Sequence, residues 1–289
     1  MKLSELYLDA RKTLSLTEEL QTAGLMARDL LCHITGKSKE QLLANMDEQV
    51  SDAVSGQMMV AVNRVLSGEP MAYVLGQWDF YGMTLEVDRN VLIPRDDTCA
   101  VTDLAIKKAL YLNRSPRILD LCTGTGCIGL AIAHRVKDAR VTLGDVSKEA
   151  LIVAKKNIAA QKLSGRVAPM VVDALKEPSS FLGEFDMIVS NPPYITTQEM
   201  LELPKSVRDY EPHLALHGGD DGLVFYRAIA ENFIKALKAG GFLCFEFGMG
   251  QGDDVCRILE MNGYTILERS RDYNDIERAV LAQYGRKEV

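Results

Sequence analysis

The sequence predicts an α/β fold in which a doubly wound, mostly parallel sheet follows a small N-terminal helical bundle, with a β-hairpin joining the two. Helical periodicity fills the first seventy residues, short β-prone pieces follow, and apolar strands then alternate with helical stretches. The predicted strands cover residues 117–121, 140–143, 168–172, 185–190 and 241–247. Because parallel neighbours need a crossover connection, this alternation indicates a parallel sheet. We therefore predict a helical domain over residues 1–73, a hairpin connector over 74–97 and a larger α/β domain over 98–289.

The helical domain is predicted from spacing and from stop signals. Apolar residues recur at the i, i+3, i+4, i+7 spacing from Ala27 to Ile34, and Gly36 follows as a C-terminal stop. Ser38 and Gln41 have the spacing of a capping box. A further helix is predicted to begin near Ser51 and to end before the segment 68–70, which reads Gly-Glu-Pro.

The connector has the pattern of a hairpin. Two β-prone pieces, residues 78–81 and 84–87, are separated by Gly82. After it, the helical and strand patterns alternate through the rest of the chain, and no repeat of fixed period is present.

Composition excludes several classes of protein. The 289 residues carry a net charge of −7, which argues against a protein that binds nucleic acid mainly by neutralising phosphates. The six cysteines and four histidines show no zinc-ligand spacing, so no metal is expected. Glu5 comes early in the chain, and no apolar run is long enough for a signal peptide or a membrane span. We expect reduced thiols, a cytoplasmic location, no membrane attachment and no stable binding of nucleic acid.

A glycine loop follows the first predicted strand of the sheet. Residues 122–129 read Cys-Thr-Gly-Thr-Gly-Cys-Ile-Gly and lead into an apolar helix. Glycines let the backbone approach a ligand closely, so we predict that this loop binds a nucleotide-like cofactor. The spacing alone does not separate a nicotinamide cofactor from S-adenosylmethionine. The predicted cofactor-binding residues here are Cys122, Thr123, Gly124, Thr125 and Gly126.

Two acids follow the next two strands. Asp145 lies where a carboxylate can accept hydrogen bonds from both ribose hydroxyls. The alternative role for Asp145 is to cap the helix that begins after Ser147. Asp173 could accept a hydrogen bond from the adenine amino group, and the alternative is an ordinary solvated loop acid. We predict both acids as cofactor-binding residues.

The segment that selects the chemistry is an apolar strand ending in Asn191-Pro192-Pro193-Tyr194. Two prolines stiffen the loop and remove two amide donors, so the loop presents acceptors. The Asn191 side-chain oxygen and the Pro192 carbonyl can hold the two N–H groups of a planar nitrogen and aim its lone pair at a methyl group. Tyr194 would pack over the planar group.

Positive charge develops on that nitrogen during displacement of a sulfonium, so both contacts strengthen toward the transition state. We therefore predict a methyltransferase that uses S-adenosylmethionine and releases S-adenosylhomocysteine. Asn191, Pro192 and Tyr194 are its predicted catalytic residues, Asn191 to Tyr194 bind the substrate, and Asn191 also contacts the cofactor. The methylated amide is a strong acid, so no general base is obligatory.

The chain resembles the bacterial peptide chain release factor glutamine-N5-methyltransferases over nearly its whole length. Besides the Asn-Pro-Pro-Tyr loop, the segments that carry the resemblance are residues 68–76, 80–82, 91–95, 211–223 and 271–278. The resemblance implies a class I methyltransferase sheet with S-adenosylmethionine held by the glycine loop and Asp145. It also implies that the substrate is the glutamine of the Gly-Gly-Gln motif in class 1 release factors, whose methylation modulates translation termination. The helical domain would help to dock that protein.

The chain departs from the family pattern in two places. Cys122 stands where the family usually has glycine, and residues 96–99 read Asp-Asp-Thr-Cys in place of Pro-x-Thr-Glu. For Cys122 the alternatives are a nucleophile or a small residue tolerated in the turn. Two further hypotheses for the whole chain are an adenine-N6 methyltransferase acting on nucleic acid and a catalytically silent adaptor.

Overall fold

The structure is a computed structural model that describes residues 1–112 and 115–285. The described chain divides into two compact units. One unit comprises Met1–Gly76 together with Lys205–Tyr210, and the other comprises Gln77–Pro204 and Glu211–Val289.

The helical unit has a core of small and branched apolar side chains from its longer helices. Leu3, Leu14, Leu30 and Leu31 are fully buried in this core, and Met58 is almost so. The helices are α1 (Leu3–Leu14), α2 (Leu20–Thr35), α3 (Lys39–Ala44), α4 (Asp52–Leu66), α5 (Met71–Leu75) and α10 (Lys205–Arg208).

The predicted helix signals of this unit are confirmed. Ser38 and Gln41 form the reciprocal capping box of α3, and the Ser51 side chain accepts a hydrogen bond from the amide of Val54 at the start of α4. Gly36 ends α2 with φ at +68°, a left-handed conformation that glycine adopts without steric cost.

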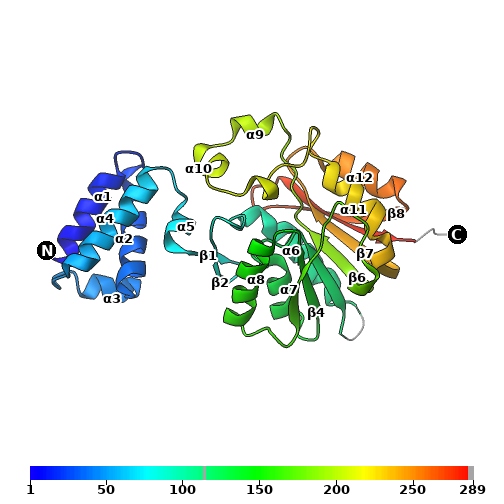
Figure 1. Cartoon of the computed structure of the whole chain (residues 1–289), viewed down its shortest axis with the longest axis horizontal. Coiled ribbons are helices and arrows are strands. Elements are labelled where there is room, and N and C mark those ends of the chain that lie inside the picture. Colours follow the sequence, from blue (N-terminus) through cyan, green and yellow to red (C-terminus); the bar gives the residue numbers. More distant parts are fainter. Residues whose placement is uncertain (113–114, 286–289) are drawn as a thin grey trace. The chain divides into compact units, whose positions relative to one another are not determined.

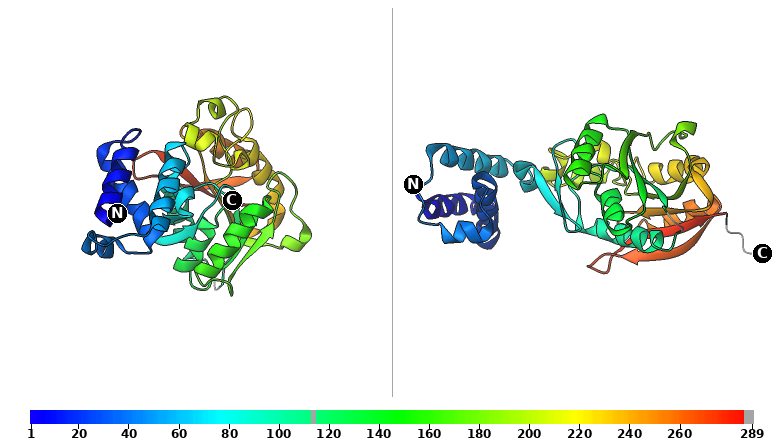
Figure 2. Two further views of the ribbon diagram at one scale, coloured as in Figure 1. Left: turned by 60° about the vertical axis from the view of Figure 1, so that its left-hand side comes forward. Right: turned by 90° about the horizontal axis from the view of Figure 1, so that it is seen from below.

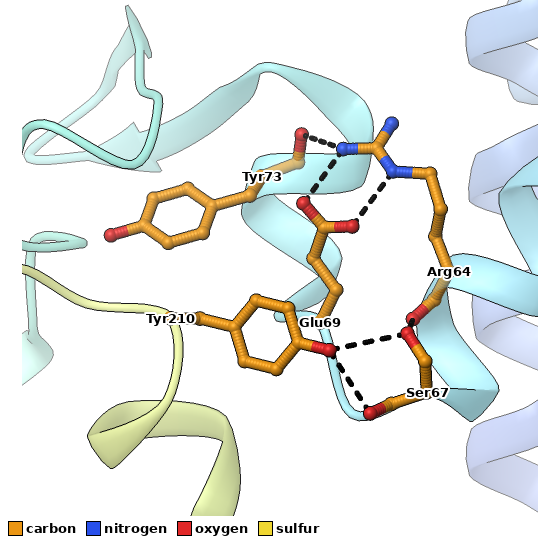
Figure 3. A network of polar contacts seen from close by, with 5 residues as sticks. All are labelled: Arg64, Ser67, Glu69, Tyr73 and Tyr210. Carbon is orange, nitrogen blue, oxygen red and sulfur yellow. Dashed lines mark hydrogen bonds and ion pairs between the residues drawn. The ribbon is translucent and has the colours of Figure 1, made fainter.

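A polar network holds the segment of Lys205–Tyr210 in the helical unit (Figure 3). The buried carboxylate of Glu69 accepts two hydrogen bonds of 2.8 Å from the Arg64 guanidinium, which also donates to the carbonyl of Tyr73 at 3.2 Å. The Tyr210 hydroxyl donates to the carbonyl of Ser67 at 3.0 Å. A segment distant in sequence therefore contributes to this unit.

The larger unit is built on a doubly wound, mostly parallel sheet, as the sequence predicts. Among the described residues the sheet has seven strands in the order β5-β4-β3-β6-β7-β9-β8. The first five strands in this order pair in parallel, and β9 pairs antiparallel with both β7 and β8. The strands are β3 (Arg117–Leu121), β4 (Arg140–Asp145), β5 (Val167–Val171), β6 (Phe185–Ser190), β7 (Leu237–Glu246), β8 (Tyr264–Arg271) and β9 (Glu277–Tyr284).

Helices cover both faces of this sheet (Figures 1 and 2). Successive strand residues point to opposite faces, so Ile118 packs in one core and Leu119 in the other. The first core lies under α6 (Cys99–Ala109), α7 (Cys127–Arg135) and α8 (Lys148–Ala160), and the second under α11 (Val224–Asn232) and α12 (Gly252–Met261). The remaining short elements are η1 (Asp96–Thr98), η2 (Ser180–Leu182), α9 (Glu199–Glu202), η3 (His213–Ala215) and η4 (Phe233–Ala236).

The hairpin of β1 (Gln77–Phe80) and β2 (Met83–Glu86) packs in the first core through Phe80, Met83 and Leu85. Strands β8 and β9 were not predicted from the sequence. Alternate side chains of β8 are exposed, so this strand lacks the continuous apolar run that identifies the central strands.

Candidate functional site

A cavity of ≈ 270 Å³ lies where the parallel strands of the larger unit end. Ligands of open α/β sheets bind at the carboxyl ends of the strands, and this volume is close to the lower limit of roughly 300 Å³ for small-molecule sites. Six of the predicted site residues line the cavity: Cys122 after β3, Gly124, Asp145 at the end of β4, Asp173 after β5, Asn191 after β6, and Pro193.

Left-handed backbone conformations build the glycine loop. The φ angles are +60° at Cys122, +52° at Gly124 and +85° at Gly126, and the turn is closed by a 2.8 Å hydrogen bond from the Gly126 amide to the Thr123 carbonyl. A Cβ atom at Gly129 would lie 2.4 Å from Leu143, so glycine is required where α7 crosses the sheet. A Cβ at Gly124 would meet no atom within 4 Å, and the backbone there is open to a ligand.

Asp120, on the strand below the loop, holds the loop in place. Its Oδ2 accepts hydrogen bonds from the Thr123 hydroxyl at 2.6 Å and from the Gly129 amide at 2.8 Å. Complete burial raises the pKa of this carboxyl to about 7, although both hydrogen bonds oppose the rise. Asp120 was not predicted as a site residue, although an acid inside an apolar strand was a visible signal.

Three predicted loop residues do not line the cavity. Thr123 and Thr125 are buried, and Thr123 is committed to Asp120. Gly126 caps α7, and its Cβ position lies 2.8 Å from Leu143. In the structure these three residues shape the loop.

Asp145 faces the cavity with a carboxylate that is already oriented. Its Oδ2 accepts from the Gly124 amide and its Oδ1 from the Ser147 amide, both at 2.9 Å. Burial raises the pKa of Asp145, and the backbone hydrogen bonds oppose the rise. The cap of α8 is Ser147, which accepts from the amide of Ala150 at 3.0 Å. The alternative of Asp145 as the capping residue is therefore wrong.

Asp173 lines the cavity from the loop after β5 and pairs with Lys176 at 2.9 Å. That ion pair lowers the pKa of Asp173. The Asp173 carboxylate is therefore ionised at neutral pH.

The Asn-Pro-Pro-Tyr loop leaves β6 in a tightly supported conformation. The Ser190 hydroxyl donates to the Leu121 carbonyl at 2.6 Å, and the Tyr194 carbonyl accepts from the Gln251 side chain at 3.0 Å. A Cβ at Gly218 would lie 2.7 Å from the Pro193 carbonyl oxygen, and one at Gly222 would lie 2.4 Å from the Tyr194 carbonyl oxygen. Gly218 and Gly222 are thus needed because backbone packs directly on backbone.

Asn191 and Pro193 reach the cavity, whereas Pro192 and Tyr194 do not line it. Nδ2 of Asn191 donates to the Thr98 hydroxyl at 3.3 Å. Tyr194 packs against the second core, and desolvation by burial is the main reason that its pKa is raised.

Two segments of the wall come from outside the strand ends. The cavity is lined by residues 90–92 and by Pro212, Leu214 and Ala215. Glu211 joins the two segments, because its buried carboxylate accepts from the Arg95 guanidinium and from the amide of Ile93. We predicted no role for either segment from the residues alone. Phe225 is a further lining residue that we missed.

The altered segment 96–99 has structural roles. Asp97 pairs with Arg278 at 2.8 Å, and Thr98 contacts Asn191.

Cys122 lines the cavity, but burial raises the pKa of its thiol, so the reactive thiolate is not formed at neutral pH. This favours the interpretation of Cys122 as a tolerated turn residue.

Residues 1–112 and 115–285 contain no cluster of three or more potential metal ligands among His, Cys, Asp and Glu. In the same part of the chain, no helix combines the length and the apolar character needed to cross a membrane.

Comparison with known proteins gives two family matches. Residues 5–76 match the PrmC N-terminal domain, and residues 101–208 match the Methyltransferase small domain. A protein of Clostridium acetobutylicum named release factor glutamine methyltransferase is 36% identical over 256 residues, covering 89% of this chain and 90% of that protein. A protein of the same name from Chlorobaculum tepidum is 37% identical over 264 residues, covering 89% and 88%.

A solved structure, the hMettl16 catalytic domain in complex with an RNA hairpin, has a TM-score of 0.57 and is 17% identical, with 85% of this chain and 87% of that chain covered. At this identity it supports the fold alone.

Proposed function

Because this chain belongs to the release factor glutamine methyltransferase family, we propose that it methylates the side-chain nitrogen, N5, of the glutamine in the Gly-Gly-Gln motif of class 1 release factors. S-adenosylmethionine would be the methyl donor. The observation that carries the proposal is one cavity that is lined by Gly124, Asp145 and Asn191 together. A cofactor cradle and an acceptor on a stiff loop thus meet at one place.

The cavity fits the proposed donor chemically. The open backbone at Gly124 allows close approach, and Asp145 supplies a carboxylate at the distance along the chain that suits ribose hydroxyls. Asp173 offers a second acceptor for the adenine amino group. The bound donor would supply an electrophilic methyl group, and the residues of the chain bind and orient the reactants.

The loop would hold the glutamine side chain through hydrogen-bond acceptors. The side-chain oxygen of Asn191 and the carbonyl of Pro192 would accept from the two N–H groups of the substrate amide, while Pro193 limits the motion of the loop and Tyr194 supports it. Because the nitrogen becomes more positive as the new bond forms, these contacts act chiefly on kcat.

We further propose that the helical domain, residues 1–73, helps to dock the release factor, and that residues 98–289 form the methyltransferase domain. Exposed apolar side chains on α1 and α2, such as Leu8 and Leu25, support a docking role. Since release factors work with the ribosome, we expect the enzyme to act in the cytoplasm.

The proposal is tested with purified protein, labelled S-adenosylmethionine and a class 1 release factor. We expect one methyl group on the glutamine of the Gly-Gly-Gln motif, located by mass spectrometry. A release factor with alanine in place of that glutamine is the control and should take up no label. Failure to label the natural release factor, under conditions in which the protein binds the cofactor, would refute the proposal.

Asn191→Ala should lower kcat by roughly 100-fold or more, by analogy with the removal of a transition-state hydrogen-bonding group. Cofactor affinity, measured by titration calorimetry, should change by less than about threefold. The matched control is Asn274→Ala, at an exposed position of the β8–β9 turn that does not line the cavity. If Asn191→Ala abolishes cofactor binding and the control does not, the loop has been assigned to the wrong ligand.

Amino methylation of adenine gains no support from the named relatives, and a catalytically silent adaptor gains none either. The release factor assay distinguishes these alternatives directly when DNA is added as a competitor. Unchanged transfer in excess DNA is expected.

A further inference from the structure

Glu246 is a buried acid that the proposed function does not use. It ends β7, is 1% exposed, and its Oε2 has no hydrogen-bond partner within the part of the chain that the structure describes. Burial raises its pKa to about 8, so the carboxyl is largely protonated at neutral pH. A buried polar atom without a partner is costly, and such groups concentrate at functional sites.

Within residues 1–112 and 115–285, no ion pair to Glu246 offsets that cost. The nearby cation is Arg278, and its guanidinium pairs with Asp97 at 2.8 Å and with Asp272 at 3.0 Å. An apolar residue in place of Glu246 would suit the surrounding core better, since Cys244, on the same face of β7, and Ala279, the partner of Glu246 on β9, are fully buried. The carboxyl therefore needs an explanation other than stability.

Strand register brings Glu246 beside the substrate loop. Ser190 of β6 pairs with Phe245 of the parallel strand β7, so Asn191 and Glu246 are the next residues along the two strands. Equivalent residues of paired strands project on the same face of a sheet. The side chains of Asn191 and Thr98 lie close enough to the Glu246 carboxyl to oppose the rise of its pKa in part.

The two ends of an asparagine amide have almost the same shape and opposite hydrogen-bonding roles. Nδ2 of Asn191 donates to the Thr98 hydroxyl at 3.3 Å, but a hydroxyl both donates and accepts, so Thr98 alone cannot select one orientation of the amide. A carboxyl group provides an acceptor oxygen in either protonation state, which favours Nδ2 on its side.

We propose that Glu246 is a positioning residue which, with Thr98, engages Nδ2 of Asn191 and thereby directs Oδ1 toward the substrate nitrogen. This inference rests on the proposed function, in which Oδ1 is the acceptor for the glutamine amide. With the amide reversed, an N–H group would face the substrate N–H, and the contact would become repulsive. Glu246 therefore acts on the rate through Asn191 and does not touch either reactant.

The first test compares Glu246→Gln with Glu246→Leu. Glutamine keeps an acceptor oxygen, so kcat should stay within about threefold of the natural protein. Leucine fits the core but has no acceptor, so kcat should fall by about 10-fold to 100-fold while KM for the release factor and cofactor affinity change by less than threefold. Unchanged kcat in Glu246→Leu, or an equal loss in both variants, would overturn the inference.

Thr98 provides an independent variant if Glu246→Leu does not fold. Thr98→Val removes the second contact with nearly the same shape, and kcat should fall by about 3-fold to 10-fold. Thr98→Ser keeps the hydroxyl and should restore the rate. A loss in Thr98→Ser equal to that in Thr98→Val would contradict an orienting role for the hydroxyl.

A second readout does not depend on the substrate. In protein labelled with ¹⁵N-asparagine, the side-chain resonance that disappears in Asn191→Ala reports the Asn191 amide. Its protons should exchange with solvent at least 10-fold faster in Glu246→Leu than in the natural protein or in Glu246→Gln. Equal exchange in all three overturns the inference. Absence of methyl transfer by the natural protein would instead refute the proposed function, so the two failures are distinguishable.

Discussion

Asp120 allows a quantitative prediction because its protonation differs between the folded and unfolded chain. Burial raises its pKa from 3.8 to about 7 in the folded state. Between about pH 4 and pH 7 the folded protein therefore binds a proton that the unfolded chain has released. By linkage, the protonated Asp120 contributes its full stabilisation below about pH 4, and this stabilisation is lost progressively as the pH rises to about 7. Above about pH 7 the free energy of unfolding no longer changes with pH through this group.

The size of the effect follows from the shift. A difference of about 3 pH units, at about 1.4 kcal/mol for each unit, corresponds to about 4 kcal/mol. Asp120→Asn replaces the carboxyl with a neutral group of the same shape, whose oxygen can still accept from Thr123 and Gly129. Relative to the natural protein, the variant should therefore gain about 4 kcal/mol in free energy of unfolding between pH 4 and pH 7.5.

The assay is urea unfolding of both proteins at pH 4.5, 5.5, 6.5 and 7.5. The single tryptophan, Trp78, lies in β1 of the larger unit and reports its unfolding by fluorescence, and circular dichroism follows the whole chain. Glu246 adds its own pH dependence to both proteins, so it cancels in the difference. Asp138→Asn, at an exposed position, should show a constant difference and is the control. A difference between Asp120→Asn and the natural protein that varies by less than 1 kcal/mol over this range would refute the reasoning.

Two further predictions concern the cofactor side of the cavity. Asp145→Asn replaces a carboxylate oxygen by an amide donor, which opposes the amide of Gly124 or Ser147. Because a hydrogen bond to a charged group contributes roughly 1.5–3 kcal/mol, cofactor affinity measured by calorimetry should fall by about 10-fold to 100-fold. A change below threefold would contradict the role of this acid. Cys122→Gly should keep kcat within about threefold, because the thiol is protonated and glycine adopts φ near +60° without strain. A loss of more than 10-fold in kcat would mean that the thiol takes part in the reaction.

Local features of the chain were predictable because their causes are local. The capping box of Ser38, the left-handed stop at Gly36 and the glycine loop depend on backbone geometry within a few residues. The central strands were recognised because strands buried on both faces are continuously apolar. The antiparallel edge strand β8 was missed because its exposed face breaks this pattern. Strand β9, which lies between β7 and β8, was missed although Ala279 to Ala282 form a buried apolar run.

The sequence by itself determined the α/β class, the helical bundle, the glycine loop and the stiff acceptor loop at Asn191, since periodicity, glycine and proline act over short distances. Tertiary structure alone decided which distant side chains meet. The pairing of Arg95 with Glu211 and the placement of Thr98 and Glu246 beside Asn191 depend on strand order and register. Strand order is a property of the whole sheet, in which β6 and β7 become neighbours only after the chain has passed through five helical segments. The proposed substrate loop could therefore be predicted from consecutive residues, whereas the groups proposed to orient its asparagine could not.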